Sequence, residues 1–165
     1  MNAKYSHCSY CGEAFPHNLR WPRQCPACGA RSYLNPLPVV VAMVPVGNGL
    51  VVVRRNIEPQ KGTLTLPGGY LDVGETWQDG ACRELLEETG ITVPPGDFRL
   101  YDVANGLDDT IVILGLALGQ PHRELVPFTS DETQEVVLID RPCELGFPLH
   151  TLVVRRFFAE TLRCI

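Results

Sequence analysis

The sequence has no long uninterrupted run of apolar residues. Its longest apolar stretches, "LPVVVAMVPV" and "IVILGLALG", fall well short of the roughly 20 residues that a membrane-spanning helix needs. Their length suits buried strands instead. The first residues, "MNAKYSHCSYC", also lack the apolar core of a secretory signal peptide. A cytoplasmic protein that does not enter a membrane is therefore expected.

The sequence also lacks a basic run. It holds 14 Lys and Arg against 19 Asp and Glu, for a formal net charge of −5. This charge does not give the broad positive surface that attracts nucleic acid, so nucleic acid is a disfavoured partner. An acidic protein that handles phosphates would need a metal ion or a few well-placed Lys and Arg residues.

Nothing in the sequence suggests a disulfide-stabilised protein. The seven cysteines are odd in number and no feature indicates secretion. Hydrophobic residues make up 45% of the 165 residues and charged residues 20%, which is typical of a globular protein with a core. This length predicts one domain, or one domain with a small appendage.

Four of the cysteines form two closely spaced pairs near the N-terminus, "CSYCG" and "CPACG". A two-residue gap lets both sulfurs of a pair point at one centre, and two pairs supply the four thiolates of a tetrahedral Zn²⁺ site. The alternatives are four ordinary buried cysteines or a redox pair. We predict a structural zinc ribbon over residues 1–36 with the ligands Cys8, Cys11, Cys25 and Cys28, followed by a second domain over residues 37–165. A ribbon alone does not indicate a function.

From Leu37 onward the sequence alternates between strand and helix patterns. The runs "PVVVAMVPV" and "LVVVRRN" flank "GNG" and predict a hairpin. Further strands are predicted at "LTLP", "FRLYDVAN", "TIVILGLALG" and "EVVLID", with a last helix over residues 149–162. Within that helix, His150 is expected to be structural. The order of elements predicts an α/β fold with a mixed sheet and helices packed on its faces.

One strong helix is predicted from Trp77 to Thr89. Thr76 and Asp79 resemble a capping box, and Gly90 suits the left-handed residue that ends a helix. At about 100° per residue, three carboxylates fall within one arc and an apolar set falls opposite. The carboxylates are Glu84, Glu87 and Glu88, and the apolar set, expected to face the core, is Cys82, Leu85, Leu86 and Thr89.

The carboxylates of this helix are poorly explained as a solvated acidic face. Arg83 and Glu87 are four residues apart and would gain about 0.2–0.5 kcal/mol, but Glu84 and Glu88 are like charges at the same spacing. Negative charge near a helix C-terminus also opposes the helix dipole. A bound Mg²⁺ or Mn²⁺ ion would explain the cluster, because carboxylate oxygens are the ligands that these ions prefer.

The stretch "GYLDVGETWQDGACRELLEETGI" resembles the Nudix box, G-x5-E-x7-R-E-U-x-E-E-x-G-U, in which U is apolar. Every fixed position is filled, by Gly69, Glu75, Arg83, Glu84, Glu87, Glu88 and Gly90, and the apolar ones by Leu85 and Ile91. The box covers 23 residues, and the order of the flanking elements is also similar to the Nudix fold. The resemblance therefore implies a Nudix α/β/α sandwich preceded by a zinc ribbon.

A zinc ribbon before the box is similar to two branches of the Nudix superfamily. One is the NADH pyrophosphatase branch, and the other is the plant and bacterial FAD/ADP-ribose pyrophosphatase branch. The stretch "RRNIEPQKGTLTLPGGYLDVGE" resembles the second branch more closely. The first carries a Ser-Gln-Pro-Trp-Pro-Phe-Pro array after its box, whereas the corresponding region here reads "YDVANGLDDTIVIL".

The resemblance implies hydrolysis of a nucleoside diphosphate linked to another group, X, with Mg²⁺ or Mn²⁺ as catalytic cofactor. Glu84 and Glu88 would be the principal ligands, joined by Glu87 when more than one ion binds. The backbone carbonyl of Gly68 would be a further ligand. Glu75 would hold Arg83 in an ion pair that orients the carboxylates.

The resemblance leaves the base that activates water open, because it is Glu84 in some members and a later acid, here Glu132 or Glu135, in others. A solvated acidic turn is the alternative for the later pair. Arg54 and Arg55 end a strand, so one is expected to point towards the site and the other away. Either arginine could bind a phosphate or be surface charge. Gly69 is also predicted to contribute to substrate binding, because it lets the substrate approach the main chain.

We therefore predict a Nudix pyrophosphohydrolase acting on a small ADP-containing nucleotide such as FAD, ADP-ribose or NADH. An alternative is a non-catalytic regulator that uses the Nudix fold as a ligand sensor and the ribbon to bind nucleic acid or protein. Another is a Nudix enzyme that removes oxidised or capped nucleotides. The resemblance also suggests a homodimer.

Overall fold

The computed structural model describes residues 4–118 and 125–161. It divides into two compact units, Met1–Pro36 and Leu37–Ile165, each described by itself. This division falls between residues 36 and 37, where the sequence predicts a boundary between two domains. Among the described residues, none of the helices is long and apolar enough to cross a bilayer.

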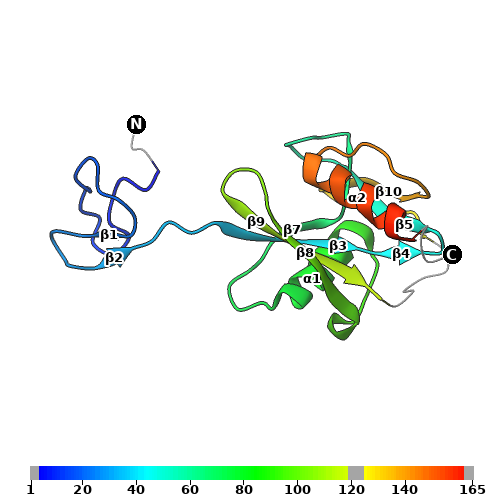
Figure 1. The fold of residues 1–165 in the computed structure, drawn as a ribbon, viewed down its shortest axis with the longest axis horizontal. Helices are drawn as coiled ribbons and strands as arrows, with labels where there is room; N and C mark the ends of the chain where they lie inside the picture. The colour runs from blue at the N-terminus through cyan, green and yellow to red at the C-terminus, as the bar shows by residue number, and fades with distance from the viewer. Residues whose placement is uncertain (1–3, 119–124, 162–165) are drawn as a thin grey trace. The chain divides into compact units, whose positions relative to one another are not determined.

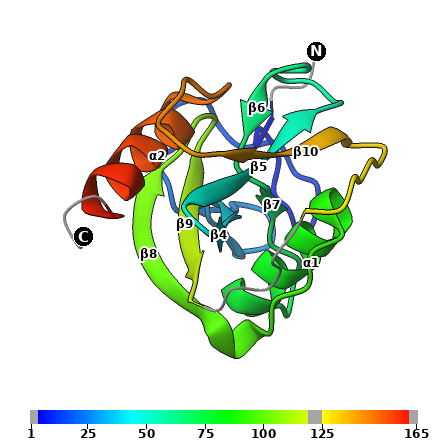
Figure 2. The same ribbon diagram turned by 90° about the vertical axis from the view of Figure 1, so that its right-hand side faces the viewer.

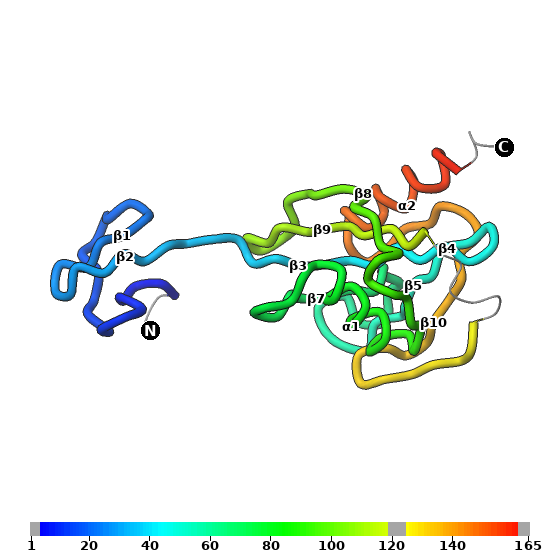
Figure 3. Tube along the Cα trace, turned by 90° about the horizontal axis from the view of Figure 1, so that it is seen from below, coloured from blue at the N-terminus to red at the C-terminus, as the bar shows by residue number. Residues whose placement is uncertain are grey.

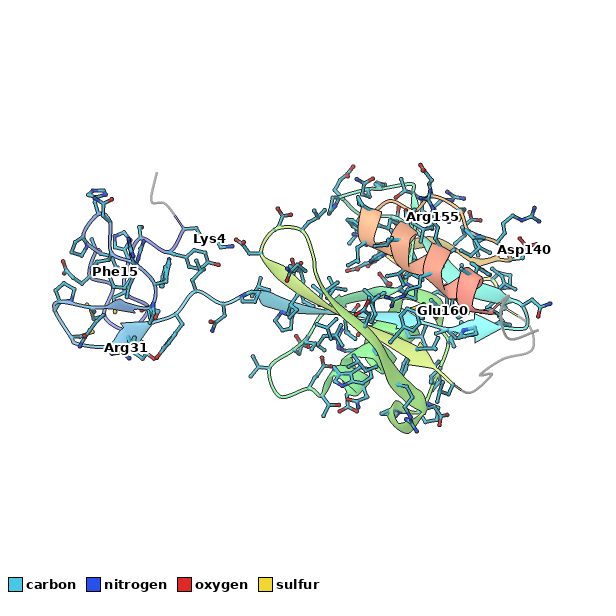
Figure 4. The ribbon with its side chains drawn as sticks, viewed as in Figure 1. Lys4, Phe15, Arg31, Asp140, Arg155 and Glu160 are labelled. Atoms are coloured by element: carbon cyan, nitrogen blue, oxygen red, sulfur yellow. The ribbon has the colours of Figure 1, made fainter. Side chains whose placement is uncertain are left out.

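The first unit is built around its cysteines and a small aromatic cluster. Strands β1 (Arg23–Gln24) and β2 (Arg31–Ser32) pair antiparallel. Cys8, Cys25 and Phe15 form its buried centre, and Figure 4 shows Phe15 among the loops of this unit. The Arg23 guanidinium lies 4.4 Å from the centre of the Trp21 ring and donates hydrogen bonds to main-chain carbonyls. Arg23 therefore supports this unit from within.

One sheet of the second unit has the order β7-β3-β9-β8. Its strands are β3 (Leu37–Met43), β7 (Gly68–Tyr70), β8 (Phe98–Asn105) and β9 (Thr110–Ala117). The pairing of β3 with β9 is parallel and the other two pairings are antiparallel. The expected mixed sheet is therefore confirmed. The strand predicted at "TIVILGLALG" ends at Ala117, and its last residue lies outside the described residues.

The other sheet has the order β10-β5-β4, with β6 also paired to β5. Its strands are β4 (Pro45–Val46), β5 (Gly49–Arg55), β6 (Leu64–Thr65) and β10 (Thr133–Ile139). The hairpin predicted across "GNG" is correct only for the two residue pairs next to the turn, in which Pro45–Val46 pairs with Gly49–Leu50. The longer partner, β3, joins the first sheet instead. The chain changes sheets at Val44, just before Pro45, which has no N–H to donate to a continued ladder.

The helices cover opposite sides of the two sheets, as Figures 1 and 2 show. Helix α1 (Trp77–Thr89) contributes Ala81 and Leu85 to one buried cluster, and α2 (Pro148–Thr161) contributes Val154 and Phe158 to another. A short 3-10 helix, η1 (Pro95–Asp97), precedes β8. This layering confirms the expected Nudix α/β/α sandwich. Residue 162, predicted as the end of the last helix, lies outside the described residues.

Helix α1 begins and ends where its sequence predicts. The Thr76 hydroxyl accepts a hydrogen bond from the Asp79 N–H at 3.2 Å, which caps the first turn. Gly90 has φ 70° and donates its N–H to the Leu86 carbonyl. A Cβ at Gly90 would lie 2.7 Å from the Phe128 ring, so the segment before β10 packs against the end of α1 (Figure 2).

The burial of α1 differs from the prediction in one respect. Leu86 was expected to face the core, but it is 50% exposed. Glu84 and Glu88 are instead 9% and 3% exposed and lie on the covered side of the helix with Leu85. A pattern based on hydrophobicity assigns carboxylates to the outside, so it misplaces a helix that covers two of them.

His150 on α2 is a buried structural residue. Its Nδ1 accepts a hydrogen bond from the Leu66 N–H at 3.2 Å. Burial, with a smaller contribution from the positive charge of Arg55, lowers the pKa of His150 to about 4. The imidazole is therefore neutral in the folded protein at neutral pH, and acid must protonate it against its surroundings.

We expect His150 to destabilise the fold as the pH falls. Between its unfolded pKa, near 6.5, and its folded pKa, about 4, the unfolded state binds more protons. Stability present above pH 6.5 is therefore lost on acidification, by about 2–3 kcal/mol at pH 4.5. Urea unfolding at pH 7.5 and 4.5 should show this loss in the wild type but not in His150→Asn, whose amide oxygen can accept the same hydrogen bond. The contributions of all other titrating groups are the same in both proteins and cancel when the two are compared. An equal loss of stability in both proteins would therefore contradict the lowered pKa of His150.

Candidate active site

Two glycines at the start of β7 bring the main chain against two carboxylates of α1, which lies beside β7 (Figure 3). The Gly68 N–H donates a hydrogen bond to Glu88 Oε2 at 2.9 Å. A Cβ at Gly69 would lie 2.6 and 2.7 Å from the two carboxylate oxygens of Glu84. On its other side, Gly68 lies so close to the Val40 main chain of β3 that a Cβ would clash there too. No larger residue fits at Gly68, and a larger residue at Gly69 would displace the Glu84 carboxylate.

The helical spacing of α1 places Glu84 and Glu88 one turn apart on the same side. Burial, with a smaller contribution from the charge of Glu84, raises the pKa of Glu88 to about 7, against the hydrogen bond from the Gly68 N–H. Burial also raises the pKa of Glu84, while the contacts with Arg83 lower it. The pair thus consists of two buried like charges. Glu87 differs, because its side chain is 58% exposed.

Arg83 is held in a network that includes Glu84. Its Nε and Nη2 donate to the two carboxylate oxygens of Glu75 at 2.7 and 3.0 Å. Its Nη1 donates to Glu84 Oε1 at 2.7 Å, and more weakly to Glu87 Oε2 at 3.3 Å. The hydrogen bonds from Arg83, helped by the Asp72 N–H, lower the pKa of Glu75 to about 2. Glu75 therefore fixes the guanidinium, and the guanidinium fixes one oxygen of Glu84.

The residues around α1 fit a divalent cation. The buried pair offers hard oxygen donors, and a cation would offset the repulsion between them. The carboxylates are less tightly gathered than the cysteines: among the described residues, only the four-cysteine group has all its ligand atoms within 4.8 Å of one another. The proposed ligands Glu84, Glu87, Glu88 and the Gly68 carbonyl thus remain a prediction.

The two arginines at the end of β5 point to opposite faces of their sheet. Side chains two residues apart in a strand share a face, so Arg54 lies on the face of Val52, which packs on the α2 side. Arg55 lies on the opposite face with Val51 and Val53, and Val51 packs on the α1 side. Arg54 donates to Glu135 Oε1 at 2.7 Å and to the Gly62 carbonyl. Arg55 donates to the Pro59 carbonyl at 2.9 Å, and its charge lowers the pKa of Glu88. Arg55 therefore lies on the α1 side of the sheet, which carries the carboxylates, and Arg54 lies on the α2 side.

The two acids before and within β10 are also separated. Glu135 lies opposite Arg54 in the β10–β5 register and is its ion-pair partner. The charge of Glu132 contributes to the raised pKa of both Glu84 and Glu88, so its carboxylate lies within electrostatic reach of them. Ser130 shapes the turn that carries it, because the Ser130 hydroxyl accepts hydrogen bonds from the N–H groups of Glu132 and Thr133. The strand register thus distinguishes two acids that the sequence left equal.

The four cysteines of the first unit meet at one point. Cys8 and Cys25 are buried, while Cys11 and Cys28 are exposed. The two pairs have the same local structure: the Gly12 N–H donates to the Cys8 carbonyl at 3.0 Å and the Gly29 N–H to the Cys25 carbonyl at 2.9 Å. Backbone N–H groups facing Cys8 lower the pKa of its thiol to about 6. Four converging sulfurs with N–H groups around them fit a Zn²⁺ ion.

Sequence reasoning missed two main-chain groups near the site. The Tyr70 carbonyl accepts a hydrogen bond from Arg83 Nη2 at 3.0 Å, and the Asp72 N–H donates to Glu75 Oε2 at 3.0 Å. Both groups orient the Arg83–Glu75 pair. Neither has a residue-type signal, because any residue supplies a carbonyl and almost any residue supplies an N–H.

Comparison with known proteins gives a family match over most of the chain. The family model for the NUDIX domain matches residues 36–152. The NAD-capped RNA hydrolase NudC of Shigella flexneri is 30% identical over 90 residues, which are 54% of this chain. NudC of Escherichia coli O1:K1 / APEC is 29% identical over a match of the same length. The chain spans only 35% of the length of these curated relatives.

Solved structures are similar over more of the chain. A NUDIX hydrolase from Nitrosomonas europaea has a TM-score of 0.76 and 28% sequence identity, covering 96% of this chain and 93% of its own. A bifunctional NMN adenylyltransferase/ADP ribose pyrophosphatase from Francisella tularensis, complexed with AMP and a manganese ion, has a TM-score of 0.65 and 26% identity. That similarity covers 77% of this chain and 42% of the other.

Proposed function

The chain belongs to the NUDIX domain family, and from that premise we propose that residues 37–161 hydrolyse the diphosphate of a nucleoside diphosphate linked to another group. One observation carries the proposal. Two buried carboxylates, Glu84 and Glu88, lie one helical turn apart against the main chain of Gly68 and Gly69. This arrangement suits binding of a cation, and with it of a polyphosphate, at a point where the main chain leaves room.

Glu84 and Glu88 would hold a Mg²⁺ or Mn²⁺ ion, with Glu87 and the Gly68 carbonyl as further ligands. When bound, such an ion neutralises diphosphate charge and lowers the pKa of a bound water. Arg83 and Glu75 keep Glu84 in position, because Glu75 holds the guanidinium at two of its nitrogens. Arg55 would bind a phosphate oxygen, since it lies on the α1 side of its sheet.

We assign the base to Glu132 rather than Glu135. A base must be free to accept a proton from the attacking water, and its carboxylate must lie near the phosphates. Glu132 lies within electrostatic reach of Glu84 and Glu88, whereas Glu135 is engaged by Arg54 on the other face of the sheet. Glu84 is less suited, because its Oε1 accepts from Arg83 and it is needed as a ligand.

The substrate that we favour contains ADP. The Francisella tularensis relative is named an ADP ribose pyrophosphatase and holds AMP, and the curated relatives are named NAD-capped RNA hydrolases. FAD, ADP-ribose and NADH share the AMP half that these names have in common. A panel of these compounds, sugar nucleotides and nucleoside triphosphates with Mg²⁺ or Mn²⁺ should release AMP from the ADP-containing members. A protein that turns over nothing in the panel would refute the proposed activity and favour a ligand sensor.

Replacing Glu132 by Gln is expected to lower kcat by about 100-fold, which is within the range for loss of a general base. The KM should change little, because Gln keeps the size of the side chain. Steady-state kinetics would measure both parameters.

Glu135→Gln is the matched control for this prediction. It removes the same charge from the same strand region but leaves the carboxylate side of the site unchanged, so kcat should stay within about threefold of the wild type. The surface ion pair with Arg54 contributes little to stability, about 0–1 kcal/mol. A larger loss of kcat in Glu135→Gln than in Glu132→Gln would reverse the assignment.

A further inference from the structure

The net charge of the chain conceals a division between its two units. Residues 1–36 hold four Lys and Arg against the single acid Glu13, a formal charge of +3. The other residues hold ten Lys and Arg against eighteen Asp and Glu, a formal charge of −8. A Zn²⁺ ion with four thiolates carries −2, which still leaves the first unit positive at +1. This unit therefore attracts anions, while the rest of the chain repels them.

The first unit also exposes aromatic rings that its core does not use. Tyr10 is 73% exposed and Tyr33 is 60% exposed. The two rings come from neighbouring segments, because the hydroxyls of Ser9 and Ser32, one residue before each tyrosine, lie 3.2 Å apart. Exposure of large aromatic side chains to water is energetically unfavourable, and such exposed residues are typical of binding surfaces. In contrast, Phe15 is buried in the centre of this unit.

A cation lies two residues from one of these rings. Arg31, in β2, and Tyr33, directly after β2, flank the buried Ser32, and both are exposed. Arg31 is exposed (Figure 4), and its partner across the strands is Gln24. Arg20 and Lys4 are exposed as well. Arg23 is different, because it is engaged by Trp21 and by main-chain carbonyls.

We propose that the surface of this unit that carries the exposed Tyr10, Arg31 and Tyr33, hereafter this face, binds single-stranded nucleic acid. Exposed rings stack on unpaired bases, and exposed Lys and Arg side chains bind the phosphates between them. Residues 4–36 contain only two short strands and no helix, so they offer no element that enters the major groove of a duplex. The combination thus fits a flexible strand with accessible bases better than a paired one.

The test measures binding of fluorescein-labelled U12 and dT12 by fluorescence anisotropy. These oligonucleotides carry no 5′ diphosphate, so they do not engage the carboxylate site as substrates. The full-length zinc-loaded protein should bind them with a salt slope of about −2, as expected for about three phosphate contacts to a single strand. A stronger response to U12 than to dT12 would indicate that the 2′-hydroxyl contributes, and comparable binding of both would indicate stacking and charge alone; both support the proposal.

Variants connect the binding to this face. Tyr33→Ala should weaken binding at least about fivefold, the lower end for loss of one stacked base, while Tyr33→Phe should retain it. Arg31→Gln should reduce the salt slope by about 0.7. Arg155→Gln removes an exposed charge from α2 (Figure 4) and should not change oligonucleotide binding. The zinc content and the AMP release of every variant should match those of the wild type.

Several results would overturn the proposal. One is the absence of measurable binding to either oligonucleotide by the zinc-loaded wild type. Another is an equal loss in Arg155→Gln and Arg31→Gln, which would indicate nonspecific attraction. A third is weaker self-association, seen by sedimentation, in Tyr33→Ala with unchanged oligonucleotide binding, which would make the face a protein interface. None of these results bears on the proposed hydrolysis, which the substrate panel tests separately.

Discussion

Glu88→Gln is expected to reduce turnover by about a thousandfold or more, because losing several kcal/mol of charge stabilisation has this effect on a rate. Glu88 is 3% exposed and is the deepest carboxylate of the site. Gln has nearly the same shape and can still accept the hydrogen bond from the Gly68 N–H. The substitution thus removes a charge without removing a contact.

The same substitution should leave the folded protein at least as stable as the wild type, although it lowers turnover. Burial raises the pKa of Glu88 to about 7, so the ionised form at pH 7.5 is unfavourable in the folded protein. The free energy of unfolding of Glu88→Gln in EDTA should therefore equal or exceed that of the wild type. Mn²⁺ binding, followed by electron paramagnetic resonance, should be weakened at least about tenfold.

Glu87→Gln is the matched control on the same helix. Its carboxylate is 58% exposed and accepts only the weaker hydrogen bond from Arg83, at 3.3 Å. Both turnover and Mn²⁺ binding should fall less than in Glu88→Gln. If Glu88→Gln kept more than about a tenth of wild-type turnover, a loss of under ~1.4 kcal/mol, the metal assignment would be wrong.

Loss of zinc is expected to unfold residues 4–36 and leave residues 37–161 folded. The buried hydrophobic core of the first unit is only Cys8, Phe15 and Cys25, with Leu19 packed against it. A chain of this length rarely folds without a metal or disulfides, and structural Zn²⁺ contributes an apparent ~10–16 kcal/mol to comparable sites. The second unit has two core clusters of its own.

Cys25→Ser tests this expectation without a chelator, which would also remove Mg²⁺. Amide resonances of the first unit should collapse to the narrow range of an unfolded chain, while those of the second unit stay dispersed. AMP release with added Mg²⁺ should remain within about threefold of the wild type. Cys143→Ser, which changes a half-buried cysteine of the second unit, should leave the ribbon resonances and the zinc content unchanged. A folded first unit in Cys25→Ser would contradict a zinc-dependent fold.

The parts of the fold that follow local rules were predictable from sequence. Helix α1 runs over the expected residues because Thr76 and Gly90 satisfy its ends by short-range hydrogen bonds. The hairpin after Leu37 was only partly predictable. The hydrophobic pattern and the Asn-Gly turn favour a long pairing of residues 37–46 with β5. In the structure, β3 pairs instead with β9 and β7, which are distant in sequence. A single sequence contains no direct signal for such pairing.

The site was predictable as a set of residues but not as an arrangement. The box motif identifies Glu84 and Glu88, yet hydrophobicity places Leu86 inside, where the structure has the carboxylates instead. Functional sites are where such rules are expected to fail, because burying charge has a use there. Strand alternation likewise indicates that one of two arginines faces the site. The packing of Val51 and Val52 on opposite sides of the sheet indicates that it is Arg55, and the pairing of Arg54 with Glu135 agrees.

The contact between Phe128 and Gly90 links the two halves of the proposed chemistry. Gly90 ends the helix that carries Glu84 and Glu88, and the Phe128 ring fills the space that a side chain at Gly90 would need. Phe128 in turn comes shortly before the turn that carries Glu132. The proposed cation ligands and the proposed base are thus connected through a packing contact outside the proposed ligand set. Because Gly90 has no side chain, the Phe128 ring can pack closely there, and a larger residue at this position would displace the segment that leads to the base.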